Sequence, residues 1–314
     1  MKYNILITGG AGNIGGSLSR ELVKRGHNIV ILDNLSTGSK RKLPSKSFQN
    51  WKFIKCDLNQ INLSNLFKNK KIDYIFHYAA VVGVQRTLKN PNLVLNDIKG
   101  IENILNFAVK KKVKRIFYAS SSEIYGEPVT IPQDEFTTPL NSRLPYAIVK
   151  NVGEAYFRSY KKTYNLDYTI FRFFNTYGPL QSDEFVITKF IDKAMKNKNL
   201  VINGNGKQTR TFLYIDDNIF LTTSIFKNKK FVNDVVNIGN DNEITIENLA
   251  KKIKKLLNSK SKIIYGKPLK DGDMKRRKPS LKRINIIKKQ KFVNLEEGIL
   301  NTAKFLRNIK WAYQ

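Results

Sequence analysis

Tyr146 and Lys150 are the two residues of this chain whose types and spacing most clearly point to chemistry. Residues four positions apart on a helix share one face, so the lysine ammonium would lie beside the phenol. A tyrosine with an ordinary pKa of about 10 is a poor base near neutral pH, and a nearby positive charge favours its phenolate. The spacing therefore predicts an activated tyrosine base. In a lysine-rich chain it also fits a solvated helix face.

A serine cluster precedes this pair. Residues 120–122 are all serine and Glu123 follows them, directly after an apolar run. Ser121 could bond a substrate hydroxyl, and Glu123 offers a second acid–base group. A serine run can also be a loop that satisfies its own backbone. With Tyr146 and Lys150 downstream, a Ser–Tyr–Lys constellation is the better interpretation.

A glycine-rich loop opens the chain. An apolar run at residues 5–8 leads into a loop whose Gly9, Gly12 and Gly15 fit G-x-x-G-x-x-G, and a helical pattern follows. Without side chains, the backbone N–H groups and the helix N-terminus can approach a pyrophosphate closely. The alternative is a merely glycine-rich turn, but the order of strand, loop and helix favours a dinucleotide site.

Asp33 supports the same interpretation, because it lies 18 residues after Gly15 at the end of the second apolar run. A carboxylate there binds a ribose hydroxyl and repels a 2′-phosphate, which favours NAD over NADP. Asp57 could accept a hydrogen bond from an adenine amino group or could equally cap a turn. Ala79 and Ala80 are small residues placed where the backbone would pass close to a cofactor, and His77 before them is expected to be a packed strand-end residue.

The elements that must position these residues alternate in type. Strands are expected at residues 5–8, 29–33, 53–56, 74–77, 116–119 and 169–173, and helices at 14–25, 93–110 and 146–164. The strands are almost continuously apolar, as strands covered on both faces should be. This alternation predicts an α/β fold with a doubly wound parallel sheet.

The second half of the chain has a looser pattern. Helices are expected at residues 185–197, 244–257 and 295–309, and strands at 211–215 and 235–238. We predict a dinucleotide-binding domain at 1–177, to which 210–240 returns, and a smaller α/β substrate-binding domain at 178–314.

Composition narrows the class of protein. The chain has 314 residues, a net charge of +31, one cysteine (Cys56) and no apolar run near the length of about 20 that a membrane span needs. A single cysteine allows no intrachain disulfide, which is typical of a reducing compartment, so we expect a cytoplasmic protein with no membrane partner. The basic residues are dispersed and no nucleic-acid-binding signature accompanies them, so we expect no nucleic-acid partner, and no metal site. The positive field would steer a dianionic sugar nucleotide towards a cleft.

The ordered motifs resemble the extended short-chain dehydrogenase/reductase family, which contains NAD-dependent nucleotide-sugar epimerases, dehydratases and decarboxylases. The resemblance covers nearly the whole chain. It rests on these segments: 8–15, 33–38, 120–126, 146–150, 172–179, 208–217 and 276–279. It implies a Rossmann fold and NAD as cofactor.

The resemblance also implies residue roles. Tyr146 would be the base, Lys150 would bind the nicotinamide ribose and lower the tyrosine pKa, and Ser121 would bond the sugar O4. Asn175, Arg210 and Arg277 would contact the substrate diphosphate or sugar, although without the family both arginines fit surface salt bridges equally well. The remaining positions carried over as cofactor contacts are Asn13, Ile14, Asn34, Ser36, Thr37, Gly38 and Leu58.

The serine cluster discriminates between reactions that share oxidation of a sugar at C4. The 4,6-dehydratases of the dTDP-glucose kind have Asp-Glu where this chain has Ser122 and Glu123. This chain therefore lacks the aspartic acid that would protonate the departing hydroxyl. This pair, Arg143 and Arg277 look more like UDP-glucuronate decarboxylases, in which such a pair works around C5 and the carboxylate. GDP-mannose dehydratases also carry a Ser-Glu pair.

Other features point elsewhere. Segments 77–85 and 180–186 are closer to 4-epimerases, and the usual Asn-Asp-Gly-Arg loop of the decarboxylases is absent. We therefore expect a UDP-glucuronate decarboxylase, with a UDP-hexose or UDP-uronate 4-epimerase second and a 4,6-dehydratase third. A non-catalytic NAD sensor would need none of Tyr146, Lys150 and Ser121. The family often forms homodimers through helices corresponding to 93–110 and 146–164, so we expect a homodimer.

Overall fold

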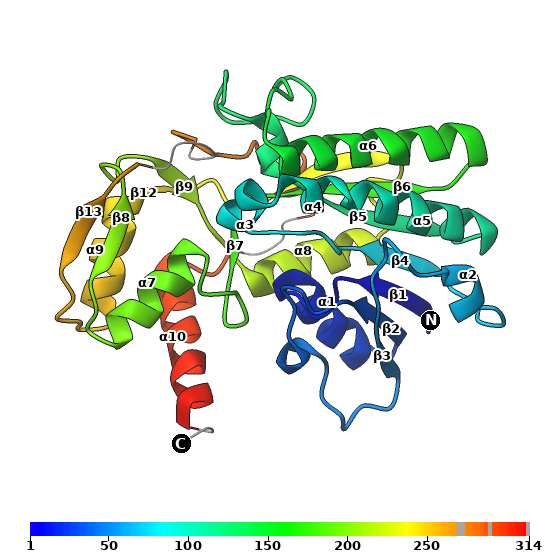
Figure 1. Ribbon diagram of the computed structural model, residues 1–314, viewed down its shortest axis with the longest axis horizontal. Helices are drawn as coiled ribbons and strands as arrows, with labels where there is room; N and C mark the ends of the chain where they lie inside the picture. Colours follow the sequence, from blue (N-terminus) through cyan, green and yellow to red (C-terminus); the bar gives the residue numbers. More distant parts are fainter. Residues whose placement is uncertain (269–273, 288–290, 312–314) are drawn as a thin grey trace. The chain divides into compact units, whose positions relative to one another are not determined.

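The computed structural model describes residues 1–268, 274–287 and 291–311, and they divide into two compact units (Figure 1). The first contains Met1–Gly126, Leu140–Phe173 and Ile219–Asn237. The second contains Glu127–Pro139, Phe174–Asn218 and Ile238–Gln314.

The first unit is built on a seven-stranded sheet in the order β11-β6-β5-β4-β1-β2-β3. Its strands are β1 (Asn4–Thr8), β2 (Asn28–Asp33), β3 (Trp51–Lys55), β4 (Tyr74–His77), β5 (Arg115–Ser121), β6 (Tyr168–Phe173) and β11 (Asp234–Ile238). Strands β3, β2, β1, β4, β5 and β6 pair in parallel. The predicted doubly wound, Rossmann-type sheet is confirmed. Chain order reverses between β1 and β4, and ligands of such sheets bind at the carboxyl ends of the strands beside this point.

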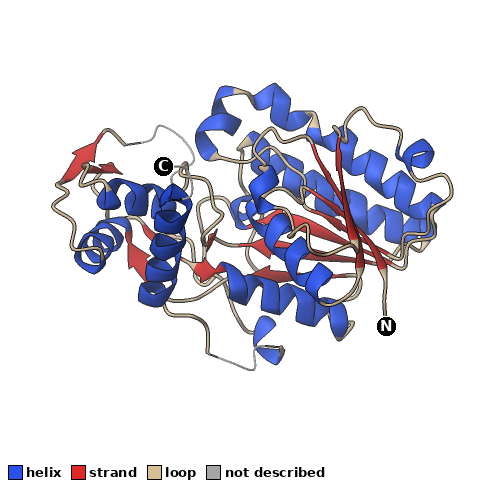
Figure 2. Cartoon of the chain, turned by 90° about the horizontal axis from the view of Figure 1, so that it is seen from below, coloured by secondary structure: helices blue, strands red, loops and turns tan. Residues whose placement is uncertain are grey.

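Helices cover both faces of the sheet (Figure 2). They are α1 (Asn13–Lys24), α2 (Leu63–Leu66), α3 (Val84–Lys89), α4 (Pro91–Leu95), α5 (Asp97–Lys110), α6 (Pro145–Tyr164) and α8 (Ile215–Lys227), and α8 crosses from the second unit into the first. Among these, α5 and α6 pack against each other, and α6 also contacts β5.

Side chains alternate between the two faces of the strands, as the two-residue period of a strand requires. Ile75, Ile116 and Tyr118 belong to the core that includes residues of α5 and α6. The Phe117 ring lies on the opposite face, where its centre is 4.4 Å from that of the stacked Phe76 ring and 5.8 Å from that of the edge-on Phe226 ring of α8. Burial on both faces explains why these strands read as apolar runs.

The second unit contains shorter elements. Its helices are α7 (Val186–Met195), α9 (Ile246–Leu256) and α10 (Leu295–Trp311), which pack together. Its strands are β7 (Thr176–Tyr177), β8 (Leu200–Asn203), β9 (Thr209–Thr211), β10 (Leu213–Tyr214), β12 (Glu243–Thr245) and β13 (Ile263–Gly266). They form three two-stranded pairs, β7 with β10, β9 with β12 and β8 with β13.

Two expected elements were wrong in detail. The expected helix 93–110 is broken at Asn96, where α4 ends and α5 begins. The expected strand 211–215 is divided, because Thr211 pairs with β12 while Leu213 pairs with β7. Ile215 already belongs to α8, whose first turn carries Asp216 and Asp217, the charge that a helix N-terminus favours. Within the described residues, no helix is long and apolar enough to cross a membrane.

Candidate active site

The serine cluster lies where β5 ends. Ser121 is the last residue of β5, and a single 3-10 turn (η2, Ser122–Tyr125) follows it. The Ser121 hydroxyl accepts a hydrogen bond of 3.2 Å from the Glu123 backbone N–H and so caps this turn. Ser121 and Ser122 are buried and Glu123 is half-buried. The cap holds three candidate side chains at the carboxyl edge of the sheet.

Helix α6 brings Tyr146 and Lys150 to the same unit. Pro145 is its first residue, a position where the missing N–H has no helical partner anyway. Lys150 follows Tyr146 by one turn, and its Nζ lies 5.7 Å from the centre of the Tyr146 ring. The Lys150 side chain is only 3% exposed, which excludes a solvated helix face for it.

The environment of Lys150 is buried and aromatic. Its Nζ lies 5.0 Å from the centre of the Tyr118 ring, which stacks on His77. Burial lowers the pKa of Lys150 to about 8, and the negative charge of Asp97 opposes this shift. Lys150 thus keeps a proton near neutral pH but holds it weakly.

His77 is a packed strand-end residue, as expected. Its Nδ1 shares a 2.8 Å hydrogen bond with the Thr8 hydroxyl, and its ring is 2% exposed. Burial, and then the charge of Lys150, lower its pKa to about 3, so the ring is neutral at pH 7. The Thr8 hydroxyl also accepts from the Ala79 N–H at 3.3 Å, which ties the start of the loop after β4 to β1.

The glycine loop has the shape of a cradle. Gly9 has φ +69°, a conformation that favours glycine, and a Cβ at Gly15 would meet the Gly9 carbonyl oxygen at 2.3 Å. Gly12 precedes α1, and Asn13 and Ile14 form its first turn, where backbone N–H groups lack helical acceptors. The buried Asn13 Oδ1 has no hydrogen-bond partner within the described part of the chain. This arrangement fits a bound pyrophosphate.

Asp33 lies against this loop. Its carboxylate accepts hydrogen bonds from the Ala11 N–H at 2.9 Å and from the Leu35 N–H at 2.8 Å. The segment carrying Asn34, Ser36, Thr37 and Gly38 follows, and its end is tied back by a 2.9 Å bond from the Ser39 N–H to the Ala11 carbonyl. The end of β2 and the glycine loop are therefore joined.

The other cofactor candidates make structural contacts. Asp57 accepts from the Asn59 N–H at 2.9 Å, which is the turn-capping alternative, while its adenine contact stays a prediction. Leu58 is buried in the core. Beyond Ala79 and Ala80, the Val81 N–H donates to Asp97 at 2.7 Å, so α5 fixes this loop.

The three substrate candidates lie in the second unit and share neighbours. Arg210 donates to the Met274 carbonyl at 2.7 Å, and Arg277 contacts the Met274 sulfur at 3.2 Å. Asn175, between β6 and β7, donates to the Thr211 carbonyl at 3.1 Å, next to Arg210. Arg277 is only 5% exposed, unlike a surface salt-bridge residue, and Arg143 of the first unit is exposed.

Three charged residues of the first unit were not among the sequence predictions. Glu154 and Arg172 are buried and bonded to each other, and half-buried Asp97 accepts a hydrogen bond from the loop after β4. The spacing of Lys150 and Glu154 was a usable signal, because four positions on a helix put both on one face.

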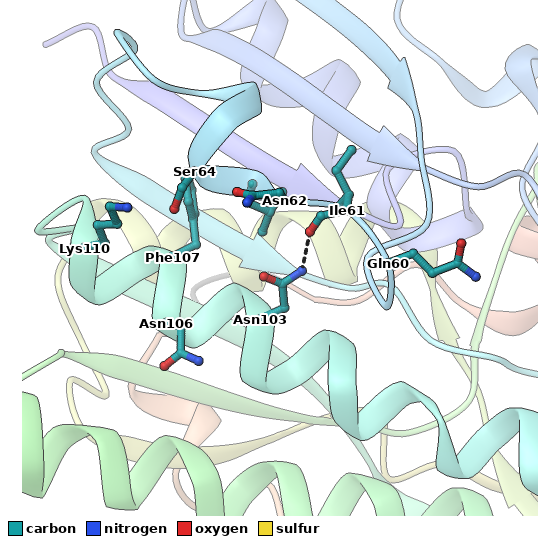
Figure 3. Close-up of a pocket in the computed structure, with 9 residues that line it drawn as sticks. Gln60, Ile61, Asn62, Ser64, Asn103, Asn106, Phe107 and Lys110 are labelled. Carbon is teal, nitrogen blue, oxygen red and sulfur yellow. Dashed lines mark hydrogen bonds between the residues drawn. The ribbon is translucent and has the colours of Figure 1, made fainter.

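A separate cavity of about 340 Å³ opens beside α2 and α5 (Figure 3). Asn103 crosses it, donating to the Ile61 carbonyl at 2.8 Å. Its lining residues are Gln60, Ile61, Asn62, Leu63, Ser64, Asn103, Asn106, Phe107 and Lys110, which include none of the candidate site residues.

Comparison with known proteins identifies the family. The pattern of the NAD dependent epimerase/dehydratase family matches residues 5–239. The chain belongs to this family. The family is NAD-dependent, so the expected cofactor is confirmed. The glycine loop with Gly9, Gly12 and Gly15 leaves room for the pyrophosphate of NAD.

Two relatives of the epimerase/dehydratase family show how far the match extends. The chain is 35% identical over 324 residues to the UDP-N-acetyl-alpha-D-glucosaminuronate decarboxylase of Bacillus cytotoxicus, covering 99% of both chains. It is 33% identical over 310 residues to a Methanocaldococcus jannaschii protein provisionally named a UDP-glucose 4-epimerase, covering 97% of this chain and 98% of the other. These relatives carry the names of two different enzymes.

A solved structure aligns over almost the whole chain. The UDP-glucose 4-epimerase of Thermotoga maritima, solved with UDP-glucose, has a TM-score of 0.91 and 28% identity and covers 98% of this chain and 99% of its own. The chain is therefore a member of a nucleotide-sugar enzyme family whose fold it shares from end to end.

Proposed function

We propose that this protein is an NAD-dependent decarboxylase of a UDP-linked uronic acid, with UDP-glucuronate as its first candidate substrate. The observation that carries the proposal is the Ser122–Glu123 pair, which follows Ser121 directly on the turn at the end of β5. This position is next to the helix that carries the candidate base, because α6 contacts η2.

The first step is removal of the proton from the sugar C4 hydroxyl by Tyr146. Lys150 keeps the phenolate accessible through its charge, and Ser121 holds the sugar O4. Bound NAD, held by the glycine loop, Asp33 and Lys150, supplies the hydride acceptor for oxidation at C4.

The next step uses the acidity that a C4 ketone gives to its neighbours. A uronic acid oxidised at C4 is a β-keto acid, and its C5–C6 bond breaks to release carbon dioxide while the electron pair passes to the ketone oxygen. Glu123 and Ser122 are the groups that we assign to the carboxylate and to proton delivery at C5. Return of the hydride to C4, with Tyr146 giving its proton back to O4, would then restore the C4 hydroxyl and complete the UDP-pentose. Glu123 is half-buried and backbone-anchored, so it can face a substrate without being fully solvated.

Three further residues are assigned to the nucleotide part of the substrate. We assign Asn175, Arg210 and Arg277 to the diphosphate. A guanidinium group can donate two parallel hydrogen bonds to the oxygens of one phosphate, and the Asn175 amide can donate one more. The names of both decarboxylase and epimerase relatives specify UDP, which supports a UDP-linked substrate. A homodimer and a cytoplasmic location are part of this proposal.

A UDP-sugar 4-epimerase is the second candidate. It is favoured by the end-to-end alignment with the Thermotoga maritima enzyme. An epimerase needs Tyr146, Lys150 and Ser121 but does not release carbon dioxide, so Glu123 would have no role in its reaction.

A panel of substrates tests the proposal. Purified protein with NAD is incubated separately with UDP-glucuronate, UDP-N-acetylglucosaminuronate and UDP-glucose, and the products are followed by proton NMR. The proposal predicts a UDP-pentose or its acetamido analogue from a uronate. A uronate inverted only at C4, or conversion of UDP-glucose alone, would promote the epimerase.

A further inference from the structure

Glu154 of α6 lies in the core of the first unit with its carboxylate fully hydrogen-bonded. It is 0% exposed and lies four residues after Lys150 on the same helix. Its Oε1 accepts from the Ser120 hydroxyl at 2.7 Å and from Arg172 Nε at 2.9 Å. Its Oε2 accepts from Arg172 Nη2 at 2.8 Å and from Arg158 at 3.0 Å.

Arg172 of β6 extends this contact to the turn after β5. Its Nη1 donates to the Tyr125 hydroxyl at 2.9 Å, and its guanidinium lies 5.0 Å from the centre of the Tyr125 ring. The Tyr125 hydroxyl in turn donates to Asn237 of β11 at 2.8 Å. Arg172, Tyr125 and Asn237 are at most 1% exposed.

The network joins the segments that carry the candidate reacting groups. Ser120 directly precedes Ser121, and Tyr125 ends the turn that holds Ser122 and Glu123. Glu154 lies one helical turn beyond Lys150. The residue before the turn is thus bonded directly to Glu154 of the helix that carries Tyr146, and the last residue of the turn is bonded to Glu154 through the Arg172 guanidinium.

A buried ion pair is poor at stabilising a fold. Desolvation of the two charges offsets their attraction, and apolar side chains of similar volume often stabilise as well or better. The pair does provide directional hydrogen bonds with fixed geometry. These bonds connect β5, β6 and α6 at the segments that carry the candidate reacting groups. Orientation of those segments therefore explains the buried charges better than stabilisation of the fold does.

We propose that Glu154 and Arg172 are positioning residues that hold the Ser121–Glu123 turn in register with Tyr146 and Lys150. This proposal rests on the proposed function only for the identity of the reaction whose rate is affected. The alignment of the Ser121–Glu123 turn with α6 would matter for any reaction that uses residues of both.

The decisive variant is the double substitution Glu154→Met with Arg172→Met, which removes both charges and keeps side-chain volume. Arg158→Met is the matched control, because Arg158 bonds the same carboxylate from the surface with its side chain 46% exposed. Thermal midpoint, NAD affinity, kcat and KM are measured on whichever UDP-sugar the wild type converts.

We expect the double variant to fold, to bind NAD as the wild type does and to lose kcat by about 10- to 100-fold, because misplaced reacting groups lower the rate steeply. KM should change by less than about threefold, and the control should retain kcat. A folded double variant with wild-type kcat overturns the proposal.

Two further measurements keep the test decisive. If the double variant does not fold, Tyr125→Phe takes its place, since it deletes one hydroxyl and the bonds to Arg172 and Asn237. A kcat loss of fivefold or more at unchanged KM supports the proposal, and an unchanged kcat overturns it.

If the wild type converts none of the UDP-sugars, the proposed function fails by itself. Amide hydrogen exchange then decides the positioning role. Faster exchange at residues 121–126 in the Tyr125→Phe variant, without change in β1, supports it, and unchanged exchange at 121–126 overturns it.

Discussion

The side-chain nitrogen of Lys150 lies 5.7 Å from the centre of the Tyr146 ring, on the same face of α6. Tyr146 is half-buried while Lys150 is only 3% exposed. The charge is therefore buried beside the phenol, where it acts more strongly than it would in water. This relationship is the basis of the proposed base and its activator.

Replacing Tyr146 tests the base directly. We expect Tyr146→Phe to lower kcat by about 10²- to 10⁴-fold, the range that a positioned proton-transfer group contributes. NAD binding should be unchanged, because no cofactor contact is assigned to the phenol. Turnover and NAD affinity by fluorescence quenching are the measurements. A variant with near-normal kcat would remove Tyr146 from the role of base.

Replacing Lys150 separates activity from stability. The folded-state pKa of Lys150, about 8, lies below its usual 10.5, so burial disfavours its charged form. Between about pH 8 and 10.5 the unfolded chain therefore binds more protons than the folded protein. The buried charge of Lys150 lowers the free energy of unfolding below about pH 8, and this loss of stability disappears as the pH rises to about 10.5. A shift of this size corresponds to about 3 kcal/mol.

Lys150→Met should therefore abolish turnover yet unfold at higher urea concentration than the wild type at pH 7. The gain should shrink as the pH approaches 10. Lys162→Met, an exposed lysine on the same helix, is the control and should change neither property. A less stable Lys150→Met protein at pH 7 would show that its charge is better solvated than its burial indicates.

Glu123 is the residue that should separate oxidation from loss of carbon dioxide. We expect Glu123→Gln to retain C4 oxidation, seen as NADH absorbance, while carbon dioxide release slows by about 10²-fold or more. The exposed Glu102 of α5 provides a matched control, Glu102→Gln, with no expected effect. Equal rates of carbon dioxide release in wild type and Glu123→Gln would contradict the assignment.

The glycine loop allows a steric test of the cofactor site. A Cβ at Gly15 would lie 2.3 Å from the Gly9 carbonyl oxygen, closer than real contacts allow. Gly15→Ala should therefore displace the loop and weaken NAD binding by at least about tenfold, or 1.4 kcal/mol. Gly266→Ala, whose Cβ would meet Val201 at an ordinary 3.4 Å, should bind NAD normally.

The sequence predicted the sheet and the order of the candidate residues because both follow from local patterns. Apolar runs showed strands buried on both faces, and the four-residue spacing placed Tyr146 and Lys150 on one helix face. The broken helix at Asn96 and the divided strand at 211–215 depend on partners distant in sequence. Pairing of Thr211 with β12 and of Leu213 with β7 has no local signal.

The charged network was hidden for the same reason. Glu154 and Arg172 are 18 residues apart in the chain and meet only because α6 packs on the sheet. In a chain with 56 lysine and arginine residues, no single arginine stands out by composition. Burial alone would raise the pKa of Glu154, but the hydrogen bonds and charge of Arg172 lower it, which only the fold reveals.

The fate of the substrate carboxyl carbon tests the central claim most directly. The protein is incubated with NAD and UDP-glucuronate labelled with carbon-13 at C6, and the label is followed by NMR. We predict labelled carbon dioxide and an unlabelled UDP-pentose in equal amounts, both formed at least about 10²-fold more slowly by Tyr146→Phe. Label retained in a C4-inverted uronate would contradict decarboxylation and make the protein an epimerase.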